Sequence, residues 1–506
     1  MRRAKIALFL GTGMFSERLW TAITARVVGK TNRLQMHGSP CDADGILPMP
    51  IERRYPGLAG VPLRISEITP RSERLSPMQQ RLLTAILGLK DVVRLGLAYQ
   101  APYRAVGAPY PRAFRRLAPA PRLPEDFEPD KDHLAGVAMR GPFSILTRRV
   151  DDGFILDLRH IAELPVRMPL LPGGGLAHFS RISSTALRTD WIELHGQRRV
   201  PGEPGYALAE KRMMVGLNTH TTLIEHLVNC HMSVAGSCAL AAYEALPTRN
   251  LLRHFLQPFI AETIRVNNSN IDGLIKSEAS NMPSYTGCRL DTLNEAIRRA
   301  VVEFDLALMD PEQRARRYGT LDEPGFVTVQ SCVEVYRLFR EMTGRFCAEA
   351  LDTLDPETMA FVRLLDETIP NGICGALAIR DLGEFTREHL AHLLAVCAFT
   401  ASASHHVVAD MVRDYMMQFH VMPPAVAADG WCRRGMVLEK LNSMTIAGIL
   451  RYRLCGTRVP MPNLAAERVW RDFQFALREH QATVEADPAN RRFRLEPELL
   501  PSSTHA

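Results

Sequence analysis

Apolar residues recur three and four positions apart over long stretches of the chain, the spacing that places them on one face of an α-helix. Most of these stretches lie in the second half, and strand-like alternation is rare after residue 200. The pattern predicts helices over 77–100, 207–246, 249–277, 291–309, 327–351, 355–369, 386–421, 435–450 and 464–486. A mainly all-α fold of many packed helices follows from this arrangement.

The rest of the chain shows weaker patterns. Seven prolines over 101–130 predict a connecting segment that lies over a surface. Between 131 and 200 the pattern is mixed, with short strands possible at 143–149 and 153–158. We further expect irregular structure over 31–75, a turn at 172–175 and an extended tail over 491–506.

The composition is that of a globular protein. Of the 506 residues, 46% are hydrophobic and 23% are charged, close to the averages of soluble domains. This balance excludes a disordered or collagen-like chain, and no run approaches the ~18 consecutive apolar residues of a transmembrane helix. The net charge of +6 is spread out without the aromatic-interleaved basic stripe of single-strand binders, so we expect no nucleic-acid partner.

The cysteines and the N-terminus bear on the cellular compartment. Ten cysteines are scattered without a Cys-x-x-Cys pair, which disfavours zinc ribbons and favours a reduced, cytoplasmic protein. Arg2, Arg3 and Lys5 precede a short apolar run at 6–15, as in a secretory signal peptide. Because glycines interrupt that run and no Ala-x-Ala site follows it, secretion is the alternative and cytoplasmic location the expectation.

Three histidines are candidate metal ligands. His226 and His231 lie five residues apart in one predicted helix, and His405 lies in another. Histidine is the commonest metal ligand, through a neutral ring nitrogen. In an ideal α-helix, residues five apart point about 140° away from one another. The pair can share a metal only where a π-bulge widens the helix, a feature found often at functional sites; the alternative is a set of unrelated core histidines.

The motifs around these histidines resemble those of the lipoxygenases. His226-Leu-Val-Asn-Cys-His231 is similar to the family's His-x4-His on a bulged central helix, and Ile264-Arg-Val-Asn267 is similar to its continuation. Ser402-Ala-Ser-His405-His-Val-Val-Ala409, followed by Pro423-Pro424, resembles the second ligand helix. Leu499-Leu-Pro-Ser502 resembles the segment that leads to the family's C-terminus.

This resemblance implies a diverged, bacterial-type member without the family's N-terminal β-barrel lipid module. It covers roughly residues 130–506, so we expect an irregular and helical lead-in over 1–130 and a helical catalytic domain over 131–506. It implies one non-haem iron, or manganese. It also implies a hydrophobic substrate, a polyunsaturated fatty acid or polyene, that loses a hydrogen from a bis-allylic carbon and then adds O2.

By the same resemblance, His226, His231 and His405 are both the catalytic residues and metal ligands. The fourth side-chain position is Ala409, whose methyl group cannot ligate. We expect water in that position; His406 or Asp410 could replace it only if the helix is rewound there.

The fifth ligand implied is the chain's own terminal carboxylate, here on Ala506. Because the segment after Leu-Leu-Pro-Ser is four residues shorter than in the family, the carboxylate must take a straighter route. A frayed tail, or His505 as the ligand, is the alternative.

Two positions are expected to contact substrate. Leu274 matches the family's substrate-clamping leucine, and Asn270 stands where the family has a small Ala or Gly that steers oxygen. A side-chain amide beside an apolar channel is costly without a partner, so Asn270 predicts a substrate that is polar near its reacting centre. We expect the apolar faces of 256–275 and 386–408 to line the pocket. These departures leave open a diverged scaffold that acts as a hydroperoxide isomerase, a cyclase or a non-redox binding protein.

Overall fold

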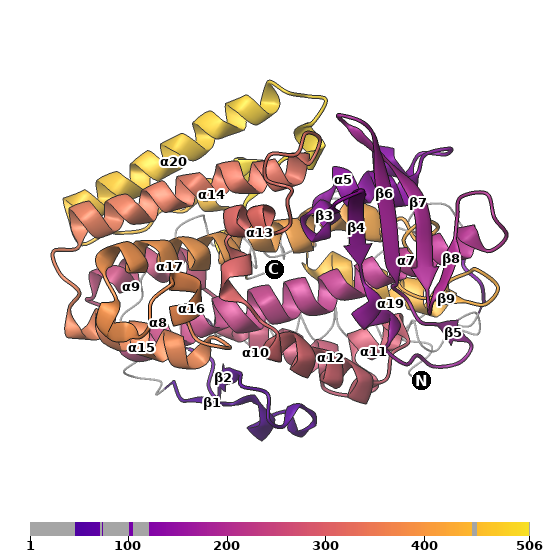
Figure 1. The fold of residues 1–506 in the computed structure, drawn as a ribbon. Helices are drawn as coiled ribbons and strands as arrows, with labels where there is room; N and C mark the ends of the chain where they lie inside the picture. The colour runs from indigo at the N-terminus through magenta and orange to yellow at the C-terminus, as the bar shows by residue number, and fades with distance from the viewer. Residues whose placement is uncertain (1–45, 71–72, 74–100, 105–120, 448–452, 505–506) are drawn as a thin grey trace, which may run out of the picture.

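The computed structural model describes residues 46–70, 73, 101–104, 121–447 and 453–504, and it is mainly helical (Figure 1). The helices predicted after residue 200 are confirmed, but the one predicted over 249–277 is two helices, and those predicted over 291–309 and 386–421 end at 302 and 416. The helix predicted over 77–100 lies outside the described residues. The observed helices are α7 Tyr206–His220, η7 Thr221–Gly236, α8 Ser237–Ala245, α9 Leu251–Ile260, α10 Thr263–Ile275, α11 Asn281–Thr286, α12 Leu290–Val302, η8 Leu306–Met309, α13 Pro311–Arg317, α14 Val327–Arg345, η9 Phe346–Ala350, α15 Pro356–Thr368, α16 Cys374–Leu377, α17 Arg387–Phe399, η11 Thr400–Ser404, η12 Val407–Met411, α18 Val412–Met416, α19 Arg434–Ala447 and α20 Leu464–Glu485.

Two long continuous helices form the centre. The first joins α7, η7 and α8, and we call it the central helix; the second joins α17, η11, η12 and α18. Figure 1 shows the central helix crossing the middle of the molecule, with α14 and α20 side by side above it. The second helix begins with a capping box, because Thr386 and His389 each satisfy a backbone N–H of the other.

The second helix also satisfies the length and apolarity of a membrane span. Over Arg387–Met416, however, 83% of its most apolar window is buried inside the protein. Buried core helices of large proteins have the same composition. Its place between α14 and the central helix is that of a core element.

A five-stranded antiparallel sheet lies at one end of the molecule, in the order β3-β4-β6-β7-β8 (Figure 1). Its strands are β3 Arg148–Val150, β4 Gly153–Asp157, β6 Leu176–Ser183, β7 Ala186–Leu194 and β8 Gln197–Arg199. The strand predicted over 153–158 is confirmed as β4. The one predicted over 143–149 is wrong for most of its length, because Pro142–Leu146 forms a 3-10 turn and only β3 follows.

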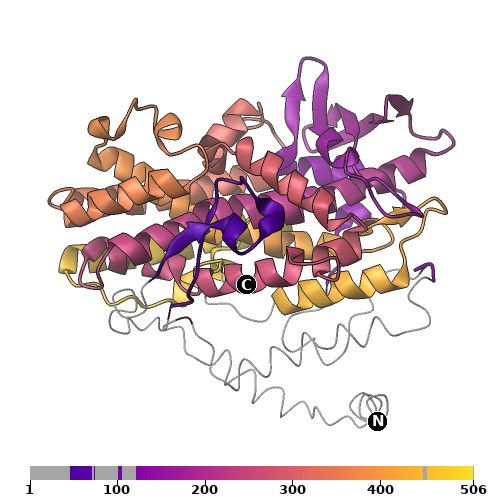
Figure 2. The same ribbon diagram turned by 90° about the horizontal axis from the view of Figure 1, so that it is seen from below.

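The sheet packs on the helical body through one face. Phe154, Phe179 and Leu187 are buried in a cluster with residues of α5 (His133–Met139) and α7. A small hairpin of β1 (Pro48–Pro50) and β2 (Arg64–Ser66) covers α10 and α12 from below (Figure 2). Apolar residues of this hairpin region share a core with the central helix, so part of the predicted lead-in packs into the helical body; the boundary at residue 130 stays a prediction.

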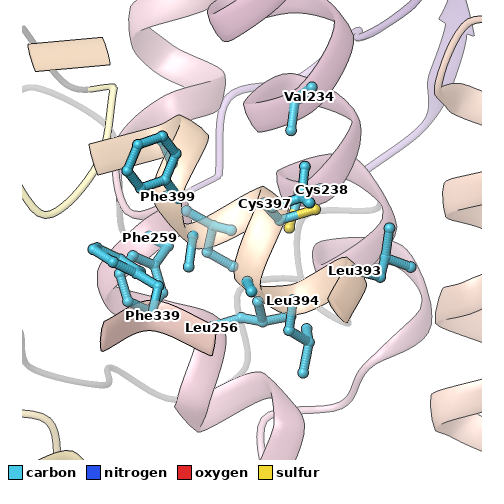
Figure 3. Close-up of a cluster of buried hydrophobic side chains, with 14 of the residues drawn as sticks. Val234, Cys238, Leu256, Phe259, Phe339, Leu393, Leu394, Cys397 and Phe399 are labelled. Atoms are coloured by element: carbon cyan, nitrogen blue, oxygen red, sulfur yellow. The ribbon is translucent and has the colours of Figure 1, made fainter. Parts of the chain in front are cut away.

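The largest core lies where α8, α9, α14, α17 and α20 meet. Figure 3 shows its middle, with Phe259, Phe339 and Phe399 packed together. The Phe339 ring is fully buried and contacts the rings of Phe259, Phe399 and Phe473 at centroid distances of 5.0 to 6.0 Å. This core supports the second helix directly below the segment that carries His405.

Replacing Phe339 with alanine should therefore leave a cavity that the packed helices cannot close. We expect a loss of about 3–5 kcal/mol in the free energy of unfolding, measured by denaturant titration. Phe475→Ala is the matched control, because the Phe475 side chain on α20 is 57% exposed, and its effect should stay within about 0.5 kcal/mol. Equal effects of the two substitutions would contradict this assignment of the core.

Candidate metal centre

A π-helical segment brings His226 and His231 to one face. All of Thr221–Gly236 is π-helical, and at about 4.4 residues per turn a five-residue spacing returns nearly to the same side of the helix. The bulged central helix predicted from that spacing is confirmed. The second helix is widened in the same way on both sides of His405, in η11 and η12.

The three histidines meet in the interior. Nε2 of His226 lies 2.9 Å from Nε2 of His405 and 3.1 Å from Nε2 of His231, and Nε2 of His405 and His231 are 3.1 Å apart. Among the described residues they are the one group of three or more His, Cys, Asp or Glu side chains placed to hold a metal. His231 and His405 are buried, and His226 is partly exposed. The expected convergence is confirmed, and the roles of these residues stay a prediction.

This spacing fits one ion bound on one face of an octahedron. Three nitrogens about 2.1 Å from an ion and about 90° apart lie about 3.0 Å from one another, whereas tetrahedral angles would separate them by about 3.4 Å. The observed separations of 2.9 to 3.1 Å match the first arrangement. The three nitrogens are therefore close enough together to bind one ion.

Asn267 of α10 sets the proton on His231. Its Nδ2 donates to the backbone carbonyl of His231 at 2.7 Å, which fixes the orientation of the amide. Its Oδ1 then faces Nδ1 of His231 at 2.8 Å. Because an amide oxygen only accepts, Nδ1 carries the proton and Nε2 keeps the lone pair that a metal needs.

Two further features support this contact. Gly236 leaves room for it, since a Cβ there would lie 2.9 Å from Nδ2 of Asn267 and 2.7 Å from the carbonyl oxygen of His231. Burial lowers the pKa of His231 to about 4, and the bond from Asn267 opposes this shift only in part. The ring is therefore neutral at pH 7 and available as a ligand.

The fourth predicted position holds no ligand side chain. Ala409 is buried on η12. The helix is rewound here, but the rewinding joins Asp410 to His406, whose Nδ1 lies 2.7 Å from Oδ2 of Asp410. Neither side chain joins the group formed by the three histidines.

The C-terminal segment runs into the interior. Leu500, Ser502, Ser503 and Thr504 are fully buried. Ser402 Oγ, three residues before His405, donates to the carbonyl of Pro501 at 2.5 Å. The tail predicted to be extended over 491–506 instead contains two 3-10 turns, Arg491–Phe493 and Pro497–Leu499. The alternative of a frayed tail is wrong through Thr504, because residues 500–504 are buried. His505 and Ala506 lie outside the described residues.

This segment ends beside the start of α10. Ser503 Oγ donates to the carbonyl of Ala261 at 2.7 Å, and the hydroxyls of Thr504 and Thr263 lie 3.3 Å apart. The last described residues are thus held between the helix that carries His405 and the helix that carries Asn267.

The predicted substrate residues lie on α10. Leu274 is partly buried and packs on a core that includes Leu223 and Leu227 of the central helix. Asn270 belongs to the same helix, but its side chain lies outside what the structure describes. Much of the apolar faces predicted to line a pocket packs in the large core instead, including Leu256, Phe259 and Leu394.

Sequence reasoning missed Asn267 as a positioning residue and the serines and threonine of the tail. Asn267 stands 36 residues after His231, and no local spacing joins them. The one available signal was its place in the segment that continues the family's histidine motif.

Comparison with known proteins shows the fold. No family model and no curated protein matches the chain. Among solved structures, a lipoxygenase variant crystallised anaerobically with arachidonate is 14% identical, with a TM-score of 0.75 over 92% of this chain and 81% of that one. Coral 8R-lipoxygenase is 13% identical, with a TM-score of 0.72 over 91% and 79%. A calcium-dependent 11R-lipoxygenase is 14% identical, with a TM-score of 0.73 over 92% and 80%. The chain has the lipoxygenase fold, as its motifs predicted.

Loss of the Asn267 amide should weaken metal binding. In Asn267→Ala we expect the affinity for Fe²⁺ or Mn²⁺, measured by competition with a chelator, to fall about 10- to 100-fold because the ring of His231 is no longer held in one tautomer. Asn268→Ala is the control, since its Nδ2 faces the carbonyl of Ser66 at 3.4 Å and not a histidine. An unchanged affinity in Asn267→Ala would show that the amide does not orient the ligand.

Two variants distinguish the predicted ligand role of Ala506 from the contribution of the tail to packing. Removing only His505 and Ala506 should lower the metal content of the purified protein while the melting temperature in the presence of chelator stays nearly unchanged, because the buried contacts up to Thr504 remain. Ser503→Ala should do the reverse, lowering the melting temperature and sparing metal content. Full metal occupancy after removal of the last two residues would rule out a terminal carboxylate ligand.

Proposed function

We propose that this protein is a non-haem metal dioxygenase of the lipoxygenase type. It binds one iron, or manganese, through His226, His231 and His405, and it inserts O2 into a polyunsaturated lipid or polyene-like substrate by way of hydrogen abstraction. The observation that carries the proposal is the convergence of three Nε2 atoms at separations of 2.9 to 3.1 Å. The lipoxygenase fold, seen also in a relative crystallised with arachidonate, supports it.

The residues of this chain would prepare the site for that chemistry. A bound metal would supply one-electron redox cycling and a base for the abstracted hydrogen. His231, held by Asn267, would offer a neutral ring nitrogen, and His405 is buried beside it. Ala409 contributes only a methyl group, which leaves one position for water, and Ala506 would supply an anionic ligand.

We also propose that the substrate is polar near its reacting centre. This rests on Asn270, which replaces a small residue on α10, one helical turn before Leu274. A hydroperoxide or another oxygen-bearing group would give its amide a partner, which a plain pentadiene does not. Location in the cytoplasm is part of the proposal, supported by nine free cysteines among the described residues.

The two positions that differ from the lipoxygenase pattern, Ala409 and Asn270, also favour a second candidate function. With Ala409 at the fourth position and Asn270 on α10, the chain would instead act as a hydroperoxide isomerase, a cyclase or a non-redox binding protein on the lipoxygenase scaffold. Metal content and oxygen consumption separate the two proposals.

The purified protein should contain close to one iron or manganese per chain, and His405→Ala should contain almost none. With loaded protein, we expect oxygen uptake on hydroperoxides or functionalised polyenes to exceed uptake on linoleate, and Asn270→Ala to shift that preference toward linoleate. Metal-free protein that takes up neither ion on reconstitution would refute the dioxygenase. Product formation from hydroperoxides without oxygen uptake would establish the isomerase instead.

A further inference from the structure

A separate cavity lies behind the central helix. It has a volume of about 480 Å³ and is bordered by α6 (Arg159–Ala162), η7, α12, η8 and α13. Ile224, Glu225 and Asn229 of η7 line it, and none of the three metal-site histidines does. At about 80° per residue, Asn229 points more than about 110° away from both His226 and His231. The cavity is therefore distinct from the candidate metal centre.

A chain of polar contacts leads to the wall of this cavity. Both terminal nitrogens of Arg314 donate to the carboxylate of Glu225, at 2.6 and 3.1 Å. Nε2 of His220 lies 3.5 Å from the same carboxylate. Nδ1 of His220 lies 2.8 Å from Nε2 of His160 on α6.

With both rings neutral, the contacts assign the ring protons. The carboxylate of Glu225, paired with Arg314, faces Nε2 of His220, which then carries the proton. Nδ1 of a neutral His220 is an acceptor, and it takes its hydrogen bond from Nε2 of His160. Nδ1 of His160 is left with a lone pair, and among the described residues it has no partner. Burial, with the neighbouring His220, lowers the pKa of His160 to about 3, which agrees with a neutral ring at pH 7.

The charges around the cavity cancel one another. Four carboxylates of its lining have arginine partners, in the pairs Asp157–Arg159, Glu163–Arg299, Glu225–Arg314 and Asp305–Arg317. The exposed Glu303 and Arg148 remain, one of each sign. The lining holds five carboxylates and four arginines, and Arg317, which pairs with Asp305 from outside the lining, balances the fifth carboxylate. The cavity therefore suits a neutral ligand better than an ionic one.

The remaining lining has both polar and apolar character. The amide of Asn229 is partly exposed and forms no hydrogen bond with a described residue. Ile161, Leu164, Phe304 and Leu308 provide apolar walls. Nine charged side chains, most of them in ion pairs, also line the cavity, so the apolar walls form only part of its surface. The volume lies in the range of small-molecule sites, about 300–1,000 Å³.

We propose that this cavity binds a neutral amphiphile whose hydroxyl donates a hydrogen bond to Nδ1 of His160. The apolar chain or ring of the ligand lies against Ile161, Leu164 and Phe304, and Asn229 offers its hydroxyl oxygen a donor. The site does not use His226, His231 or His405, so it stands independently of the proposed dioxygenase function.

The probe pair is 1-octanol and 1-methoxyoctane, which share an apolar chain while only the first can donate. In ligand-observed NMR titrations of the full-length protein, 1-octanol should bind about 2- to 10-fold more tightly, the contribution of one net hydrogen bond. His160→Phe should abolish this difference, whereas Asn229→Ala should weaken the binding of both probes and leave the difference in place, because the oxygen of either probe can accept from the amide of Asn229. His254→Phe, on the distant helix α9 where Nδ1 contacts the carbonyl of Pro460, should leave it intact.

A second measurement covers the case in which His160→Phe does not fold. In the wild-type protein, nitrogen-15 shifts should show the proton of both His160 and His220 on Nε2. Equal affinities for the two probes, an unchanged ratio in His160→Phe, or a proton on Nδ1 of His160 would each overturn the proposal. Metal content and activity enter none of these measurements.

Discussion

Three imidazole lone pairs that point into one space repel one another unless a cation lies between them. The Nε2 atoms of His226, His231 and His405 are 2.9 to 3.1 Å apart, and Asn267 ensures that the nitrogen of His231 in this group is the unprotonated one. Protonation of the rings would relieve this repulsion, but burial opposes protonation of His231. The three nitrogens are thus placed where they could hold a cation, and the packing of the two helices keeps them there.

Holding this spacing requires distortion on both helices. π-Helical turns are rare because their backbone geometry is less favourable than that of the α-helix, and here they extend over Thr221–Gly236 and flank His405. Such segments persist when the surrounding packing fixes them. The aromatic core below the second helix and the close contact at Gly236 supply that packing.

Sequence reasoning succeeded where a local pattern reports a local structure. Apolar spacing located the long helices, and the five-residue separation of His226 and His231 indicated the widened helix. It failed for β6 and β7 because a register shift at Asp190 breaks the alternation: Leu187 and Thr189 are buried before the shift, and Ile192 and Leu194 after it. A strand whose inward residues change parity midway carries no uniform period-2 signal.

It also failed where partners are distant in the chain. Ser503 and Thr504 are polar and close to the terminus, which predicts exposure, yet they are buried by hydrogen bonds to residues more than 200 positions earlier. The pairing of Asn267 with His231 and of Arg314 with Glu225 likewise depends on the packing of separate helices. Family resemblance identified the histidines because their motif is local; it included Asn267 in a neighbouring motif but gave that residue no role.

The face of the central helix that carries His226 and His231 and the face that carries Glu225 cannot move independently, because both belong to η7. Glu225 directly precedes His226, and its carboxylate is held from behind by Arg314 in a buried ion pair whose disruption would leave a charge unpaired. A rotation or one-residue slip of η7 would therefore break this pair and move both histidines out of reach of His405. The ion pair thus adds to the apolar packing that fixes the rotation of the helix. Glu225 and Arg314 also line the cavity beside it, so a ligand there would contact the same segment that sets the spacing of the three histidines.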